Sequence, residues 1–326
     1  MQPGIEAALT AFGLVASAEP APVDNSILNQ NYRVDTSEGS YFLRAYRRGR
    51  TLERLQREQA AAAWVSERGL PTPVAIASPG AETLIEVEGQ FWSLYRWIDG
   101  GTYRRGEITP PEAERLGMVH GQCMAILRNY PSLDLPPNSE LTWSTEKTIE
   151  ALEAVASEVD RRGNDQERRW HAKQLAIISS GVARPSTAFA QLATQATHGD
   201  YHERNVMFRH DDTLAAVVDW ERFCVQPPAF EVLRAVSFML LLDAEPLRAF
   251  LEGFRRNNSL DANAVRPAVD AWWQSSLHNT WVFRDYFLAG NEEARRFLPE
   301  EEGRSSRFND SAFRSWLAET IVRYAC

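Results

Sequence analysis

The pattern of apolar residues changes at Gly100-Gly101, and this change restricts the chain to a fold with two unlike parts. Five strand-like runs precede the two glycines, at residues 31–36, 40–46, 73–77, 83–88 and 91–97. Helical spacing dominates after them. For 326 residues we therefore predict an α+β chain with two domains. A small N-terminal sheet lobe spans residues 1–98, and a larger, mostly helical lobe spans residues 99–326.

The first part also contains one long helical pattern. Residues 31–36 and 40–46 alternate between apolar and polar side chains around a Gly-containing turn, which predicts a β-hairpin. Residues 51–68 have helical spacing, with Thr51 as the expected N-cap. The Pro- and Ala-rich stretch at 19–23 breaks the pattern before the hairpin.

The second part is predicted to be helical with two short strands. The expected helices are 111–128, 145–159, 166–180, 230–242, 246–255, 264–289 and 311–324. The strands are expected at 206–208 and 214–218. Three glutamates and a glycine at 300–303 predict a charged, solvated loop.

Composition excludes several classes of protein. The net charge of −9 argues against a large nucleic-acid surface, and no run approaches the ~20 apolar residues of a membrane span. The first 19 residues lack the basic start of a secretory signal. Three widely spaced cysteines indicate no disulfide framework, so we expect a cytoplasmic protein, either a monomer or a homodimer. Only Lys147 and Lys173 are lysines, so any cationic role in the first 140 residues falls to arginine.

Two oxygen-bearing side chains lie in the segment Thr-His-Gly-Asp-Tyr-His-Glu-Arg-Asn, and a third follows it after two short apolar runs. Asp200 and Asn205 are five residues apart, and Asp219 ends the second short strand. A hairpin between the two strands would bring Asn205 and Asp219 together. Mg²⁺ is held by such oxygen ligands together with substrate phosphates. Asp200 would then remain to accept a proton, which is the layout of a phosphoryl-transfer site.

The motif His-Gly-Asp-x-His-x-x-Asn resembles that of the aminoglycoside phosphotransferase superfamily, which includes choline kinases, kinase-like homoserine kinases, methylthioribose kinases and a bacterial stress-response kinase. The resemblance implies a bilobal, protein-kinase-like fold over essentially the whole chain, with ATP or GTP and Mg²⁺ as cofactors. It implies that Asp200 is the catalytic base and that Asn205 and Asp219 are the metal ligands. His198 and His202 would support the loop.

Two other interpretations of this motif are a polar surface turn and a zinc site on His198 and His202. The chain also departs from the family at two positions. Glu231 stands where the family usually has an aspartate that braces the catalytic loop. Met124 stands where we expect the histidine of a supporting helix, which leaves His120 as a core or boundary histidine.

A buried ion pair is expected in the first lobe. Glu58 lies on the otherwise apolar stripe of the 51–68 helix, and a buried carboxylate needs a partner. The nearest strand cation is Arg44, and the family places a lysine or arginine here to bind the nucleotide phosphates. The alternatives are a surface pair between Glu58 and Arg54 at i,i+4, and an edge-strand charge at Arg44.

Two further segments are candidates for the nucleotide site. A polar loop before the second strand offers Asn25, Ser26 and Asn29 to the phosphates, although it also fits a plain turn. The segment that connects the lobes would hydrogen-bond adenine through the backbone between Tyr95 and Trp97.

Aromatic residues gather in the segment expected to bind the acceptor. Trp273, His278, Trp281 and Asp285 could line a cleft in which indole rings hold a cationic amino group. Packing between helices explains the same residues equally. From Phe230 onward the chain has 14 acidic residues and 12 arginines, a net charge of −2, which weakens a polycationic acceptor.

These observations predict ATP-dependent phosphate transfer to a hydroxyl of a small molecule: homoserine, an amino alcohol, an amino sugar or an aminoglycoside-like antibiotic. The alternatives are a stress-type Ser/Thr protein kinase and a nucleotide-binding pseudokinase scaffold. No long activation segment follows Asp219, which disfavours the protein kinase. The intact Asp200, Asn205 and Asp219 disfavour the pseudokinase.

Overall fold

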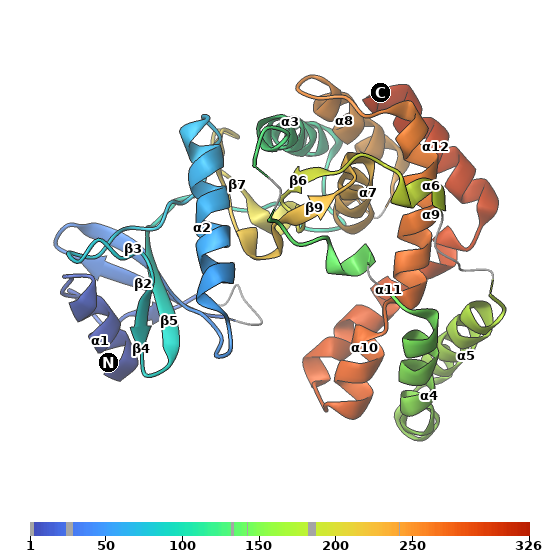
Figure 1. Cartoon of the computed structure of the whole chain (residues 1–326), viewed down its shortest axis with the longest axis horizontal. Coiled ribbons are helices and arrows are strands. Elements are labelled where there is room, and N and C mark those ends of the chain that lie inside the picture. Colours follow the sequence, from blue (N-terminus) through green and yellow to red (C-terminus); the bar gives the residue numbers. More distant parts are fainter. Residues whose placement is uncertain (1–2, 24–28, 132–133, 142, 182–186, 241) are drawn as a thin grey trace. The chain divides into compact units, whose positions relative to one another are not determined.

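The computed structural model describes residues 3–23, 29–131, 134–141, 143–181, 187–240 and 242–326 (Figure 1). The chain forms two compact units. The first unit comprises Met1–Arg104 and Glu203–Phe223, and the second comprises Arg105–His202 and Cys224–Cys326. The first contains a small antiparallel sheet and the second is mainly helical, which confirms the predicted α+β class. The domain boundary between residues 98 and 99 stays a prediction.

The first unit contains two main helices and the larger sheet. Its elements are α1 (Pro3–Ala11), β1 (Ala21–Pro22), β2 (Gln30–Thr36), β3 (Gly39–Ala45), α2 (Leu52–Glu67), β4 (Ile85–Val87), β5 (Gln90–Arg96), the 3₁₀ turn η2 (Glu203–Asn205), β7 (Val206–Phe208), β8 (Leu214–Val217) and the 3₁₀ turn η3 (Trp220–Arg222). The strand order of the sheet is β1-β2-β3-β5-β4, so β3 is central.

The two faces of this sheet have different partners. Tyr41, Leu43 and Ala45 of β3 are buried in one apolar cluster with Ile5 and Leu9 of α1. Because side chains alternate along a strand, Phe42 and Arg44 point to the opposite face. Helix α2 contributes Glu58 to that second face, where it meets Arg44.

Most of the predicted local structure of this unit is present. The hairpin β2–β3 is confirmed, with Thr36 opposite Gly39, and the Thr51 hydroxyl caps α2 by accepting a hydrogen bond from the Arg54 amide. The predicted strand at 73–77 is wrong. Its Pro73 lacks an N–H for a ladder, and only a single backbone bond, from Ile76 to Leu94, ties this stretch to the sheet.

The fifth strand of the sheet is β1 instead, which lies inside the 19–23 stretch that we expected to break the pattern. It is only two residues long and pairs with β2 at the edge of the sheet, where proline is tolerated.

The second unit is built from helices around two short strands. Its elements are α3 (Pro110–Leu127), η1 (Ser139–Leu141), α4 (Thr145–Arg162), α5 (Asp165–Ser179), α6 (Thr187–Ala190), β6 (Gln195–Thr197), β9 (Cys224–Gln226), α7 (Pro228–Met239), α8 (Ala244–Arg255), α9 (Ala262–His278), α10 (Trp281–Phe283), the π-helical turn η4 (Arg284–Leu288), η5 (Glu292–Phe297), α11 (Leu298–Phe308) and α12 (Ser311–Ala325). Strands β6 and β9 pair with each other and were not predicted, because three residues are too few to show a period.

Helices α3 and α8 approach each other very closely. A Cβ atom on Gly117 of α3 would lie 2.0 Å from the carbonyl oxygen of Phe250 in α8. Only glycine permits this approach, which places α3 firmly on the second unit's core.

Two predictions about this unit are wrong. The expected helix 264–289 ends at His278, because Gln174 donates hydrogen bonds to the carbonyls of Leu277 and Asn279 and so replaces the next helical turn. The expected loop 300–303 lies within α11, which has Pro299 in its first turn. Pro followed by acidic residues is a helix-start signal that we had interpreted as solvation.

Within the part of the chain that the structure describes, no helix combines the length and the apolar character needed to cross a membrane.

Candidate active site

The hairpin β7–β8 of the first unit places two predicted metal ligands side by side. Val206 pairs with Val217, and the Val218 amide donates a hydrogen bond of 2.9 Å to the carbonyl oxygen of Asn205. Asn205 therefore lies beside the residue that precedes Asp219. The predicted hairpin is confirmed, and the metal-binding role stays a prediction.

Asp219 has an unusual backbone conformation and a carboxylate oxygen that makes no hydrogen bond to the described residues. Its φ of 65° lies in the left-handed region, which costs a non-glycine residue energy and is found mainly at functional sites. Its Oδ1 is buried with no hydrogen-bond partner among the described residues. The chemistry of one carboxylate and one amide oxygen suits Mg²⁺, which takes its remaining ligands from phosphates and water. No group of three or more His, Cys, Asp or Glu that could hold a metal occurs in the described segments.

Arg44 is the centre of a charged cluster in the first unit. Its NH1 lies 3.3 Å from Oε1 of Glu58 and 3.6 Å from Oδ1 of Asp219. Its Nε donates a hydrogen bond to Oδ1 of Asn31. Because β3 is the central strand, the alternative of an edge-strand charge is wrong. The alternative of a surface pair for Glu58 is also wrong, because this side chain is 7% exposed and meets Arg44 instead of Arg54.

Burial and neighbouring charges shift the pKa values of Glu58 and Arg44. Burial raises the pKa of Glu58 to about 7, although the nearby Arg44 guanidinium opposes this change. Burial acts to lower the pKa of Arg44, but the carboxylates of Asp219 and Glu58 outweigh it, and the pKa is raised. Arg44 is thus permanently charged, and Glu58 is the member of the pair that changes protonation near neutral pH.

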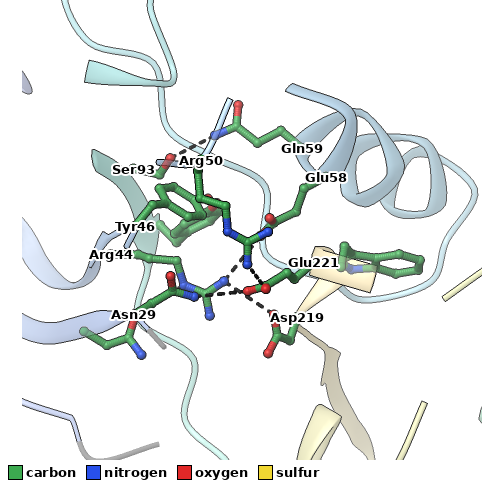
Figure 2. Close-up of polar contacts among 12 residues, drawn as sticks. Asn29, Arg44, Tyr46, Arg50, Glu58, Gln59, Ser93, Asp219 and Glu221 are labelled. Atoms are coloured by element: carbon green, nitrogen blue, oxygen red, sulfur yellow. Dashed lines mark hydrogen bonds and ion pairs between the residues drawn. The ribbon is translucent and has the colours of Figure 1, made fainter. Parts of the chain in front are cut away.

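A second arginine, which we did not predict, reinforces the cluster. Arg50 forms an ion pair with Glu221, and Figure 2 shows its guanidinium between Glu58 and Glu221. Burial lowers the pKa of Arg50 to about 10, and the nearby Arg54 contributes to this. Glu221 also accepts a hydrogen bond from Asn29 Nδ2 at 3.3 Å. Its position two residues after Asp219 is the only signal for it in the sequence.

The structure places the predicted nucleotide-binding residues in different surroundings. Asn25 and Ser26 lie outside the described residues. Asn29 uses both ends of its amide, since Oδ1 accepts from the Arg47 backbone amide and Nδ2 donates to Glu221, and its contact with the phosphates stays a prediction. Tyr95 lies in β5 with its hydroxyl 3.1 Å from that of Tyr46.

Trp97, the other predicted adenine neighbour, has its backbone amide bonded to the carbonyl of Ser40 at 3.0 Å. Its indole donates to Asp99 at 3.1 Å and stacks beneath the guanidinium of Arg33. The adenine contacts stay a prediction.

The candidate catalytic loop of the second unit begins where β6 ends. The pairing of Thr197 with Cys224 anchors its start, and Gly199 turns the chain with a φ of 76°, which only glycine adopts readily. The His198 Nδ1 atom accepts a hydrogen bond of 3.2 Å from the Asp200 amide. This contact is the one that a supporting role for His198 requires.

Two cationic or basic side chains flank the Asp200 carboxylate. The NH2 atom of Arg234 lies 2.6 Å from Oδ1, and Nε2 of His202 lies 3.7 Å from Oδ2. Asp200 is part-exposed, whereas Arg234 is 4% exposed. Arg234 comes from α7 and was missed, although it lies one helical turn after Glu231 in the sequence.

Glu231 and His120 support the same loop from two helices. Oε1 of Glu231 accepts a hydrogen bond of 3.1 Å from the Gly199 amide, and Oε2 accepts one from Gln226. His120 of α3 stacks on Tyr201 at 4.1 Å and lies 4.0 Å from Glu231. Burial lowers its pKa to about 3, with a smaller contribution from His198, so it is neutral. The core position predicted for His120 is confirmed, and it contacts the loop directly.

The predicted acceptor residues are engaged in packing. His278 donates from Nδ1 to the carbonyl of Gln274 at 2.8 Å and stacks on Trp143, and burial lowers its pKa. Trp273 and Trp281 pack against the apolar cluster around α4, α5 and η4. Asp285 lies 3.7 Å from the guanidinium of its neighbour Arg284. These contacts favour the packing interpretation, and an acceptor role stays a prediction.

Comparison with known proteins agrees with this geometry. Residues 20–272 match the phosphotransferase enzyme family. A homoserine kinase of Caulobacter sp. (strain K31) is 23% identical over 260 residues, which cover 76% of this chain and 74% of that protein.

Three solved structures share the fold at 13% sequence identity each. An amicoumacin kinase in complex with AMP-PNP and Ca²⁺ has a TM-score of 0.65 and covers 98% of this chain and 94% of its own. A microcompartment-associated aminopropanol kinase has a TM-score of 0.64, with 98% of both chains covered. A spectinomycin phosphotransferase in complex with ADP and spectinomycin has a TM-score of 0.63, with 97% of both covered.

The matched region includes Arg44, Glu58, Asp200, Asn205 and Asp219, the residues that carry the expected chemistry. The predicted kinase-like fold is confirmed by the shared fold of the solved structures. The chain belongs to the phosphotransferase enzyme family, and it is an enzyme that transfers phosphate to a hydroxyl of a small molecule.

Proposed function

We propose that this enzyme transfers the γ-phosphate of ATP to a hydroxyl group of a small, weakly charged acceptor, with Mg²⁺ as the metal. The observation that carries this proposal is the Arg44 cluster. A buried arginine shared by Glu58 and Asp219 supports a role in binding phosphates, because a guanidinium can hold phosphate oxygens bidentately.

In this proposal the residues of the first unit bind the nucleotide. Arg44 binds phosphate oxygens, and Glu58 keeps its guanidinium in place. Asn205 and Asp219 fit Mg²⁺ because they offer an amide and a carboxylate, one oxygen of which is buried without a hydrogen bond. When bound, Mg²⁺ supplies positive charge that neutralises the transferring phosphate. ATP as donor also leads us to place the reaction in the cytoplasm.

The residues of the second unit act on the acceptor. Asp200 orients the acceptor hydroxyl and takes its proton as the oxygen attacks phosphorus. The groups around it include Arg234 and His202, and the nearby Glu231 is occupied by the Gly199 amide. This is a poor environment for a polycation, which requires several unpaired carboxylates.

Homoserine is therefore our first candidate acceptor, followed by an amino alcohol and an amino sugar. The similarity to a homoserine kinase supports this order, as does the fold shared with an aminopropanol kinase. An aminoglycoside-like antibiotic ranks last on charge, despite the shared fold with a spectinomycin phosphotransferase.

Two other functions are less well supported. A protein kinase holds its peptide on a long segment after the metal-binding aspartate. Here residues 220–227 contain only η3 and β9 before α7 begins. A pseudokinase scaffold has no need for an arginine held on the oxygen of Asp200.

The test is ADP release from Mg-ATP, repeated with Mg-GTP, in the presence of single acceptors. The panel contains L-homoserine, 1-amino-2-propanol, choline, methylthioribose, glucosamine, spectinomycin, an aminoglycoside and a macrolide. Asp200→Asn is the control. Release that needs both one compound and Asp200 supports the proposal and identifies the acceptor. ATP binding without release for any compound would instead favour a protein substrate or a scaffold.

A further inference from the structure

Two residues on one face of α7 contact the candidate catalytic loop. Glu231 accepts the Gly199 amide, and Arg234, one helical turn later, reaches the Asp200 carboxylate. The helix therefore contacts the loop at two successive residues, once through a backbone amide and once through a side chain. Such a template sets the orientation of Asp200 as well as the path of the backbone.

Arg234 is itself held in place. It is 4% exposed, and its guanidinium carbon lies 4.8 Å from the centre of the Phe238 ring, one turn further along α7. A buried guanidinium needs an anionic partner, because an uncompensated charge away from water is costly. The distance of 2.6 Å to Oδ1 makes Asp200 that partner.

Arg234 and His202 approach different oxygens of the Asp200 carboxylate. The NH2 atom of Arg234 lies 2.6 Å from Oδ1, and Nε2 of His202 lies 3.7 Å from Oδ2. Because the contact with Arg234 is the shorter one, Arg234 fixes the orientation of the carboxylate more tightly than His202 does.

We propose that Arg234 is a positioning residue, which grips Oδ1 of Asp200 and thereby orients the carboxylate toward the acceptor hydroxyl. The inference rests on the proposed function of Asp200. In the step, the hydroxyl proton moves to the Asp200 carboxylate, the hydroxyl oxygen forms a bond to the γ-phosphorus, and the bond from that phosphorus to the β-phosphate oxygen breaks to release ADP.

The test uses Arg234→Lys and Arg234→Gln in the full chain. The lysine retains the charge without the fork of the guanidinium, and the glutamine retains a donor without the charge. Arg314→Lys and Arg314→Gln are matched controls. Arg314 is also a part-buried arginine of the second unit, with its Nε 3.5 Å from Asp270.

ADP release from Mg-ATP is measured with L-homoserine as the probe acceptor and also with water alone. We expect Arg234→Gln to lower kcat about 100-fold, the size of loss that follows misplacement of a reacting group, and to leave the KM for ATP within about twofold. Arg234→Lys should recover about tenfold of that loss, since it restores the charge only. The Arg314 variants should keep wild-type kcat.

The contact between Arg234 and Asp200 is also tested without an acceptor, by urea unfolding of Asp200→Asn, Arg234→Gln and the double variant. The proposal requires that the double variant loses less stability than the two single losses combined, because the two side chains contact each other and either single change already removes that contact. Strict additivity would overturn it.

The outcomes separate the two claims. Wild-type protein without Asp200-dependent ADP release overturns the proposed function, and unfolding still decides whether the pair exists. Asp200-dependent release with unchanged kcat in Arg234→Gln overturns the inference alone. A higher kcat in that variant also overturns the positioning role, because Arg234 would then hold Asp200 in an inactive orientation.

Discussion

The two units use buried charge in opposite ways. In the first, one arginine, Arg44, is shared by the carboxylates of Glu58 and Asp219. In the second, one carboxylate, Asp200, is gripped by one arginine, Arg234. In the proposed function, Arg44 stands beside a metal ligand in the first unit, whereas Arg234 stands beside the proton acceptor in the second.

The difference extends to the groups that titrate. The pKa of Glu58 is raised to about 7, and that of His120 is lowered to about 3. Each is neutral at mildly acidic pH for the same reason, since burial penalises charge. One is an acid and the other a base, so the two have opposite effects on stability as the pH changes. Because the effects overlap between pH 4.5 and 6.5, each is obtained from the difference between variant and wild type.

The largest effect should come from His120→Phe, which keeps the aromatic stack on Tyr201 but cannot be protonated. In the wild type the unfolded chain binds a proton at His120 below pH 6.5 and the folded chain does not until about pH 3. This histidine therefore costs stability as the pH falls through that window, by about 5 kcal/mol. The variant should lack this loss in urea unfolding at a series of pH values. His210→Gln, at an exposed position, controls for the removal of a histidine, and an unchanged slope in His120→Phe would contradict the assignment.

Asp200→Asn should lower kcat about 10³-fold, within the range for loss of a general base. The KM for ATP should change little, because the nucleotide residues belong to the first unit. The measurement is steady-state ADP release with the acceptor from the panel. Asp270→Asn, which removes the partner of Arg314, is the matched control and should retain activity. Equal losses in both variants would mean that the effect is one of folding.

Glu58→Gln should remove a pH dependence of the unfolding free energy that is opposite in sign to the one caused by His120. The folded wild type binds a proton at Glu58 between pH 4.5 and 7 and the unfolded chain does not, so stability falls as the pH rises through this window. The expected loss is about 3 kcal/mol, which the variant should lack. Urea unfolding at pH 5 and 7.5 measures it, with the exposed Glu53→Gln as control. A variant that follows the wild-type slope would show that Glu58 is ionised throughout.

The smallest effect is expected for Arg44→Lys. Lysine keeps the charge, but it cannot bond to Asn31 and Glu58 and also grip a phosphate in the plane of a guanidinium. We expect the KM for ATP to rise about tenfold, equivalent to about 1.4 kcal/mol, with a smaller change in kcat. Arg57→Lys, at a surface pair with Glu53 in α2, should leave both constants unchanged. An effect on kcat alone would remove Arg44 from the nucleotide site.

Local signals in the sequence predicted local structure well. The Thr51 cap, the β2–β3 hairpin and the β7–β8 hairpin depend on residues that are close along the chain. The failures come from long-range competition. Residues 73–77 have strand-like composition, yet β1 occupies the fifth place in the sheet. The helix at 264–289 is broken because Gln174, far away in sequence, bonds to its last carbonyls.

The residues of the candidate site also divide into those with a local signal in the sequence and those without one. Asp200, Asn205 and Asp219 could be identified because a motif records their spacing. Arg44 and Glu58 could be paired because a buried carboxylate requires a cation. The sequence gives no such local requirement for Arg234, Arg50 and Glu221, since charged side chains at these positions are equally compatible with exposure to water.

By itself, the sequence determined the α+β class, the short-range elements and the chemistry of the motif, because periodicity, turn residues and fixed spacings act over a few residues. Only the tertiary structure decided which charges meet. Arg44 reaches Asp219 from a distant strand, and Arg234 of α7 contacts Asp200 in the loop that follows β6. Partner choice depends on which faces burial brings together, and burial is a property of the packed units and not of any segment alone.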